Sequence, residues 1–213
     1  MIQILDENNF FYTIHKPAGF SVHNETPSVL EFIQKLGKSD HFVNRLDLET
    51  SGLMIIAKDP KYHAPLSESL HRGTKTYRAL LRGEIKDSTI DSSPLIWDRP
   101  LTDKSEGRKN PQGTAKDRVP CRTEVRIIRK NKYLSEVFAE IKTGRQHQIR
   151  KHAALAGHPI VGDKRYNDPK YNEKIFKMFS SQRLFLHAEK LEFHFQNQLY
   201  NYISTDFSLD HFF

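Results

Sequence analysis

The chain has 213 residues and a formal net charge of +7, and its 37% hydrophobic and 28% charged residues suit a globular fold and exclude wholesale disorder. A single cysteine, Cys121, excludes an intrachain disulfide and a thiolate metal cage, and no apolar run approaches the roughly 20 residues that span a bilayer. The start of the chain lacks the pattern of a secretory signal, so we expect a cytoplasmic protein, and the positive charge favours a polyanionic partner.

The first part of the chain predicts strands from short apolar runs bounded by turn residues. These strands cover residues 10–15, 53–57 and 75–83. Ser28 lies three positions before Glu31, which is capping-box spacing and predicts a helix that ends at Gly37. A second helix is expected from Asp59 to Arg72, with Gly73 as its terminator and with Pro65 delaying its regular part.

Residues 43–52 place two opposite charges, a turn and a glycine between two apolar runs. If residues 43–48 are extended, Leu46 and Leu48 share one face, and Arg45 and Asp47 share the other. Asp47 would then lie on a loop anchored by the core, a common place for chemistry on a rigid scaffold. From the residues alone a second interpretation stays open, because an aspartate in such a loop often accepts backbone N–H bonds as a turn or cap residue.

Residues 86–122 are the least regular part of the chain, because prolines and glycines occur there among charged residues. A loop of this length is usually functional or mobile. Its basic residues are expected either to touch a phosphate backbone or to be solvated: Lys104, Arg108, Lys109, Lys116 and Arg118. Strands at 123–128 and 133–141 are expected to form a hairpin around the turn at 130–132.

No acidic residue occurs between Glu140 and Asp163, whereas cations accumulate there, which predicts a local positive field. Thr143 and Gln146 repeat the capping-box spacing and predict a short helix with a basic face over 145–156. A later helix is expected around 173–179, followed by strands at 184–188 and 191–195, and the tail after 197 has no clear pattern. These elements favour one α+β domain over residues 1–213, with a mixed, mainly antiparallel central sheet flanked by helices and loops.

Four motifs together resemble those of the RluA-type pseudouridine synthases. They are Lys-Pro-Ala-Gly at 16–19, Arg-Leu-Asp-Leu-Glu-Thr-Ser-Gly at 45–52, Lys-Thr-Tyr at 75–77 and Thr-Gly-Arg-Gln-His-Gln-Ile-Arg at 143–150. Residues 157–163 and 186–188 extend the similarity over nearly the whole chain. The resemblance implies a pseudouridine synthase fold and an isomerase that converts uridine in RNA to pseudouridine without a metal or an organic cofactor.

The resemblance also implies roles for individual residues. Asp47 resembles the catalytic aspartate and Arg145 its ion-pair partner, while Tyr77 resembles the aromatic residue that packs on the target base. Arg45 resembles the residue that fills the helix after the base has left, and Ile149 an apolar wall of the pocket. Three further cations are candidate phosphate contacts, each with an equally simple interpretation as surface charge: Lys75, Arg150 and Lys151.

The chemistry agrees with these roles. The reaction breaks the bond between ribose and the base nitrogen and rejoins the base through carbon 5, so it needs neither a redox cofactor nor an activated water. A carboxylate can act as the nucleophile, and an arginine fork beside it keeps it ionised and oriented. The sequence leaves open whether Asp47 attacks the base or the sugar, and Glu49, two residues later, is assigned to solvent.

Three features limit the resemblance. Asn44 stands where the family commonly has histidine, which leaves the expected nucleophile intact but alters local packing or substrate fit. The region after Phe195 also lacks the His-Pro turn that the resemblance leads us to expect there. The similarity begins near Met1, so we expect a stand-alone monomeric catalytic domain that selects structured tRNA or rRNA through its own surface. The competing hypotheses are a non-catalytic RNA-binding protein or RNA chaperone on the same scaffold and, more weakly, a nucleoside-cleaving enzyme.

Overall fold

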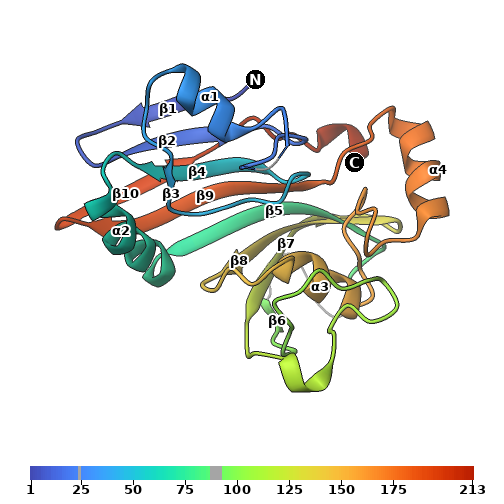
Figure 1. The fold of residues 1–213 in the computed structure, drawn as a ribbon. Coiled ribbons are helices and arrows are strands. Elements are labelled where there is room, and N and C mark those ends of the chain that lie inside the picture. Colours follow the sequence, from blue (N-terminus) through green and yellow to red (C-terminus); the bar gives the residue numbers. More distant parts are fainter. Residues whose placement is uncertain (24, 87–92) are drawn as a thin grey trace. The chain divides into compact units, whose positions relative to one another are not determined.

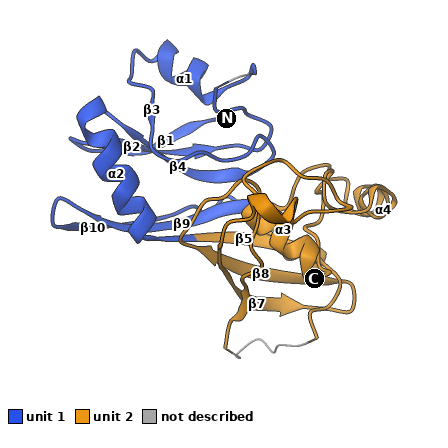
Figure 2. Ribbon diagram, turned by 60° about the horizontal axis from the view of Figure 1, so that its bottom comes forward, with its two compact units in different colours: residues 1–75, 187–207 blue, residues 76–186, 208–213 orange. Residues whose placement is uncertain are grey.

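The computed structural model describes residues 1–23, 25–86 and 93–213, and its elements are labelled in Figure 1. The chain forms two compact units. Unit 1 comprises Met1–Lys75 and His187–Phe207, and unit 2 comprises Thr76–Leu186 and Ser208–Phe213, drawn in blue and orange in Figure 2. Within the described residues, no helix has the length and apolar content needed to cross a membrane.

Unit 1 is built on a mixed sheet in which the strands follow the order β1-β2-β4-β9, with β3 paired to β4 and β10 paired to β9. The pairs are antiparallel except that of β4 with β9, which is parallel. The strands are β1 (Gln3–Glu7), β2 (Phe11–Lys16), β3 (His41–Phe42), β4 (Ser51–Ala57), β9 (Leu186–Phe195) and β10 (Gln198–Ile203). Every residue of β4 is buried, as its continuous apolar run predicts.

Two helices accompany this sheet. Helix α1 (Val29–Lys35) begins as predicted, because the Ser28 side chain accepts the backbone N–H of Glu31. Helix α2 (Pro60–Arg72) is capped by Asp59 and continues through Pro65, so the expected delay of its regular part is wrong.

The end of α2 depends on close packing. Gly73 has φ −78°, so glycine is not needed there for a left-handed turn. A side chain would instead meet Cβ of Phe193 at 2.9 Å, and only glycine allows β9 to approach this closely.

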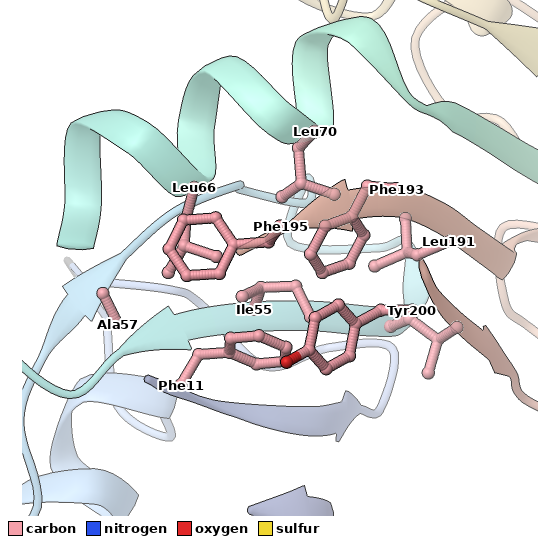
Figure 3. Close-up of a cluster of buried hydrophobic side chains, with 10 residues drawn as sticks. Phe11, Ile55, Ala57, Leu66, Leu70, Leu191, Phe193, Phe195 and Tyr200 are labelled. Carbon is pink, nitrogen blue, oxygen red and sulfur yellow. The ribbon is translucent and has the colours of Figure 1, made fainter. Parts of the chain in front are cut away.

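The core of unit 1 lies between α2 and the sheet (Figure 3). Leu66 and Leu70 are one helical turn apart and point from α2 toward Ile55, Phe193 and Phe195. Burial of each large apolar side chain contributes about 1.5–3 kcal/mol. The remaining members of the cluster are Phe11, Leu53, Ala57, Leu191 and Tyr200.

The described residues of unit 2 contain the strand order β5-β8-β7-β6 and two helices. Its elements are β5 (Thr74–Arg82), which begins in unit 1, β6 (Leu95–Trp97), β7 (Thr123–Lys130), β8 (Leu134–Ile141), α3 (Gln148–Leu155) and α4 (Pro169–Phe179), with short 3₁₀ turns at Ala115–Asp117 and Asp210–Phe212. Strands β7 and β8 form the predicted antiparallel hairpin. The α+β class and the mixed, largely antiparallel sheet are therefore confirmed.

Several boundaries differ from the predictions. The helix expected over 145–156 begins only at Gln148, because His147 adopts a left-handed conformation with φ 55°. The strands expected at 184–188 and 191–195 are one strand, β9, and the helix expected around 173–179 begins at Pro169. The tail contains β10, and the predicted loop 86–122 contains β6, while its residues 87–92 lie outside the described residues.

Candidate active site

The loop that carries Asp47 lies in unit 1 between β3 and β4 and is not a regular strand. Residues 43–48 are not an extended strand, so the condition for the expected alternation is not met, and Leu46 is buried whereas Leu48 is 43% exposed. The chain turns at Leu48, and the N–H of Thr50 donates to the carbonyl of Asp47 at 3.1 Å. Asp47 is half-buried and Arg45 is exposed.

A buried lysine holds this loop from within unit 1. Lys16 is fully buried, and its Nζ donates to the carbonyls of Pro17, Phe20 and Leu48 at 3.1, 2.8 and 3.2 Å. The N–H of Gly19 also donates to the Leu48 carbonyl, at 2.8 Å. The Lys-Pro-Ala-Gly motif therefore fixes the backbone next to Asp47, a role that its lysine does not reveal in the sequence.

Asn44 supports the same loop on its other side. Its Oδ1 accepts the N–H of Ile55 at 2.8 Å, and its Nδ2 donates to the carbonyl of Leu53 at 3.4 Å. Both ends of the amide thus bind the backbone of β4. Asn44 has a structural role in this chain at the position where histidine was expected.

The start of β4 is fixed by a buried histidine. His187 on β9 is 1% exposed, and its Nδ1 and Nε2 lie 2.8 and 3.0 Å from Oγ of Ser51 and Ser204. Phe207 stacks on the imidazole with a centroid distance of 5.0 Å. Since Ser51 follows the Asp47 loop directly, these contacts anchor the end of the loop to the C-terminal part of unit 1.

Two of the predicted site residues lie close together on β5. Lys75, in unit 1, is 8% exposed, and its Nζ donates to the carbonyl of Leu70 at 2.6 Å. Burial lowers the pKa of Lys75 from 10.5 to about 8. Tyr77, in unit 2, shares the buried face of β5 with Lys75 and Ala79, as the alternation predicts. Lys75 is therefore a buried amine in this fold, whereas a phosphate contact requires an accessible one.

Arg145 lies in unit 2, in the turn before α3. Its Nη1 donates to Oδ2 of Asp103 at 2.9 Å, and the N–H of Gln146 donates to Oδ1 of the same carboxylate at 3.1 Å. The predicted capping box does not form, because the Thr143 hydroxyl donates to Oε1 of Gln148 and His147 provides no side-chain cap. Desolvation raises the pKa of Asp103, but the hydrogen bonds from Gln146 and Arg145 outweigh it and lower the pKa below 3.8.

The predicted basic face of α3 points into the protein. Arg150 is 4% exposed and forms two hydrogen bonds with Asp163, from Nε at 2.8 Å and from Nη2 at 3.0 Å. Lys151 is fully buried and donates to the carbonyls of Thr102 and Lys104. Arg150 and Lys151 were expected to be phosphate contacts or surface charges, and their burial contradicts both expectations. Ile149 is 5% exposed, which suits an apolar wall.

The predicted site residues are divided between the two units. Arg45, Asp47 and Lys75 belong to unit 1, and Tyr77, Arg145, Ile149, Arg150 and Lys151 belong to unit 2. The ion pair between Asp47 and Arg145 stays a prediction. In the described part of the chain, no group of three His, Cys, Asp or Glu side chains is placed to hold a metal ion.

Comparisons with known proteins identify the family. The model of the RNA pseudouridylate synthase family matches residues 10–155. The chain belongs to this family. The matched region includes the Asp47 loop, Tyr77 and Arg145, and the resemblance derived from the motifs is confirmed.

Two relatives illustrate the similarity. The tRNA pseudouridine synthase C of Salmonella typhimurium is 30% identical over 207 residues, which cover 90% of this chain and 80% of the relative. The ribosomal large subunit pseudouridine synthase C of Pasteurella multocida is 34% identical over 200 residues, which cover 90% of this chain and 60% of the relative.

Solved structures share the fold. The human RNA pseudouridylate synthase domain containing 1 superposes with a TM-score of 0.76 at 21% identity, over 97% of this chain and 84% of that protein. Human RNA pseudouridylate synthase domain containing 4 gives a TM-score of 0.77 at 21% identity, over 95% and 87% of the two chains. The pseudouridine synthase fold predicted from the sequence is thereby confirmed.

Proposed function

We propose that this chain isomerises specific uridines in structured tRNA or rRNA to pseudouridine, with Asp47 as the catalytic nucleophile. One observation carries the proposal: in this chain, which belongs to the family, Lys16 and Gly19 hold the backbone of the Asp47 loop. Asp47 itself is half-buried. A fixed backbone and a partly accessible carboxylate suit a nucleophile, which must reach its substrate from a set direction.

In the proposed reaction, the base must first leave the RNA stack, which costs a few kcal/mol. Stacking on Tyr77 offsets part of this cost, at about 1–3 kcal/mol per base, and Arg45 fills the space that the base leaves. Arg145 pairs with Asp47 and orients its carboxylate, and Ile149 forms an apolar wall. The glycosidic bond to nitrogen breaks, a bond from the ribose to carbon 5 forms, the proton on carbon 5 is released, and the freed ring nitrogen takes up a proton. All heavy atoms are kept, so no cofactor takes part.

The names of the relatives guide the choice of RNA. The Salmonella typhimurium protein is named for tRNA, and the Pasteurella multocida protein for the large ribosomal subunit. We infer that this chain acts on one of these two classes, as a cytoplasmic monomer with one catalytic domain over residues 1–213. Mapping pseudouridine in RNA from cells that lack the protein identifies the modified position.

The test uses RNA labelled with tritium at carbon 5 of uridine. Wild-type protein is expected to release tritium from RNA of cells that lack the protein, and Asp47→Ala is expected to release it at least about 1,000-fold more slowly. Glu49→Gln, two residues along the same loop, is the control and should retain activity. Equal release by wild type and Asp47→Ala would overturn the assignment of Asp47. Salt-sensitive RNA binding without release would favour the non-catalytic protein, and free uracil would favour the nucleoside-cleaving enzyme.

A further inference from the structure

Asp103 is an acidic residue that the motifs do not include, and it contacts Arg145 directly. It lies in the segment between β6 and β7, and its carboxylate accepts hydrogen bonds from the Arg145 guanidinium and from the N–H of Gln146. One carboxylate therefore binds both the side chain of Arg145 and the backbone next to it. The bond from Gln146 fixes the carboxylate relative to the backbone beside Arg145, and the bond to Nη1 then holds one nitrogen of the guanidinium by a charge-assisted contact.

The segment around Asp103 is itself held in place from α3. Lys151 is fully buried, and its Nζ donates to the carbonyl of Thr102 at 2.7 Å and to that of Lys104 at 2.8 Å. These are the residues immediately before and after Asp103. Isolated exposed ion pairs contribute little, because both side chains must lose freedom to form them. Here the backbone on both sides of the acid is already fixed by a buried cation.

The contact leaves part of Arg145 available. Its Nε is buried and has no hydrogen-bond partner within the described residues, while Nη1 is bound by Asp103. A guanidinium carries five N–H donors in a rigid fork, so it can bind a second anion through another edge. Asp103 is thus placed to hold one edge of Arg145 while another edge binds elsewhere.

We propose that Asp103 is a positioning residue that fixes the Arg145 guanidinium before RNA binds. The inference rests on the proposed function, in which Arg145 orients the Asp47 carboxylate. An arginine that is fixed in advance loses little further conformational entropy when the reaction complex forms. Loss of Asp103 therefore slows the chemical step and leaves RNA affinity nearly unchanged.

The experiment compares Asp103→Asn with a matched control, Asp117→Asn. Asp117 lies in the same segment and accepts a hydrogen bond from Lys104 at 2.9 Å, so it is an acid in a similar ion pair that does not include Arg145. Single-turnover tritium release is measured over a range of RNA concentrations. At saturating RNA, Asp103→Asn should be about tenfold slower, which corresponds to about 1.4 kcal/mol, with RNA affinity within about twofold of wild type. Asp117→Asn should match wild type within about twofold, and Asp103→Glu should recover part of the rate.

A double-mutant cycle separates positioning from a general structural effect. In an Arg145→Lys background, Asp103→Asn should cause no further loss, because the residue it positions is already changed. An unchanged rate for Asp103→Asn, a loss that persists in full in the Arg145→Lys background, or a change confined to RNA affinity would each overturn the inference. Failure of the proposed function is distinguishable, since the wild-type protein would then release no tritium.

Discussion

Replacement of Asp163 by alanine tests whether Arg150 serves the fold or the RNA. Asp163 is fully buried and binds Nε and Nη2 of Arg150 at 2.8 and 3.0 Å. Its Oδ1 also accepts the N–H groups of Arg165 and Tyr166, at 2.9 and 3.0 Å. The variant leaves a guanidinium and two backbone donors without this carboxylate in the interior of unit 2.

The expected cost follows from these contacts. Removing one partner of a buried ion pair costs about 3–5 kcal/mol, because the other charge stays buried. That range is taken to include the two lost bonds to backbone N–H groups, which are each worth about 1 kcal/mol. Asp163→Ala should thus lower the free energy of unfolding by about 3–5 kcal/mol. At about 2–4 °C per kcal/mol for a chain of this size, Tm should fall by roughly 6–20 °C.

The assay is urea unfolding followed by circular dichroism, with Glu173→Gln as the control. Glu173 accepts a hydrogen bond from Lys177 at 2.7 Å on the surface of α4, and loss of such an exposed pair should cost less than about 0.5 kcal/mol. Adding Arg150→Met to Asp163→Ala should restore part of the stability, because no uncompensated charge remains.

Two results would refute this reasoning. One is a loss below about 1 kcal/mol for Asp163→Ala, which would mean that Arg150 is not held as a buried charge. The other concerns RNA. If Arg150 contacted a phosphate, Arg150→Met would lower the slope of log affinity against log salt by about one, whereas a buried structural cation leaves that slope unchanged.

Two further predictions concern unit 1. Gly52 has φ +123°, and a Cβ there would meet the backbone N of Ala188 at 2.6 Å. Gly52→Ala should therefore lower the free energy of unfolding, measured in urea, by roughly 2 kcal/mol or more. Gly107→Ala, which meets nothing within 4 Å, should be neutral, and equal stability of the two variants would contradict the packing argument. Burial lowers the pKa of Lys75 from 10.5 to about 8, so between these pH values the unfolded chain binds more protons and stability rises with pH. Across that pH window the free energy of unfolding of wild type should rise by up to roughly 3 kcal/mol relative to that of Lys75→Met. Parallel plots of unfolding free energy against pH for the two proteins would exclude a lowered pKa for Lys75.

Elements with local causes could be predicted from the sequence. The Ser28 cap of α1, the Asp59–Pro60 start of α2 and the β7–β8 hairpin depend on residues a few positions apart, and the structure contains all three. The start of α3 could not be predicted in this way. Its capping-box spacing is present, but Thr143 binds Gln148, and Asp103, more than forty residues away in sequence, binds the N–H of Gln146. A distant carboxylate thus takes one of the donors that a local cap would have satisfied.

The candidate site likewise contains residues that the sequence indicates and residues that it does not. Motif spacing selected Asp47, Tyr77 and Arg145 as candidates, and the family that the motifs indicated is confirmed, while the roles of these three residues stay predictions. The supporting residues have no such signal: Lys16 binds Leu48 and His187 binds Ser51 through contacts between segments that are 32 and 136 residues apart. Such contacts form only when distant segments of the chain pack together. The residues that flank a lysine or a histidine in the sequence do not indicate which distant group it will contact.

The positions of the cations in the sequence therefore do not identify the RNA-binding surface. Four cations within or beside the motifs are buried and bind carbonyl or carboxylate oxygens inside their own unit: Lys16, Lys75, Arg150 and Lys151. A buried cation that binds such oxygens cannot release counterions from a phosphate backbone. The salt dependence of RNA binding must then come from exposed cations such as Arg45. Each exposed cation that contacts a phosphate should lower the salt slope by about one when it is replaced, whereas replacement of a buried one should leave that slope unchanged.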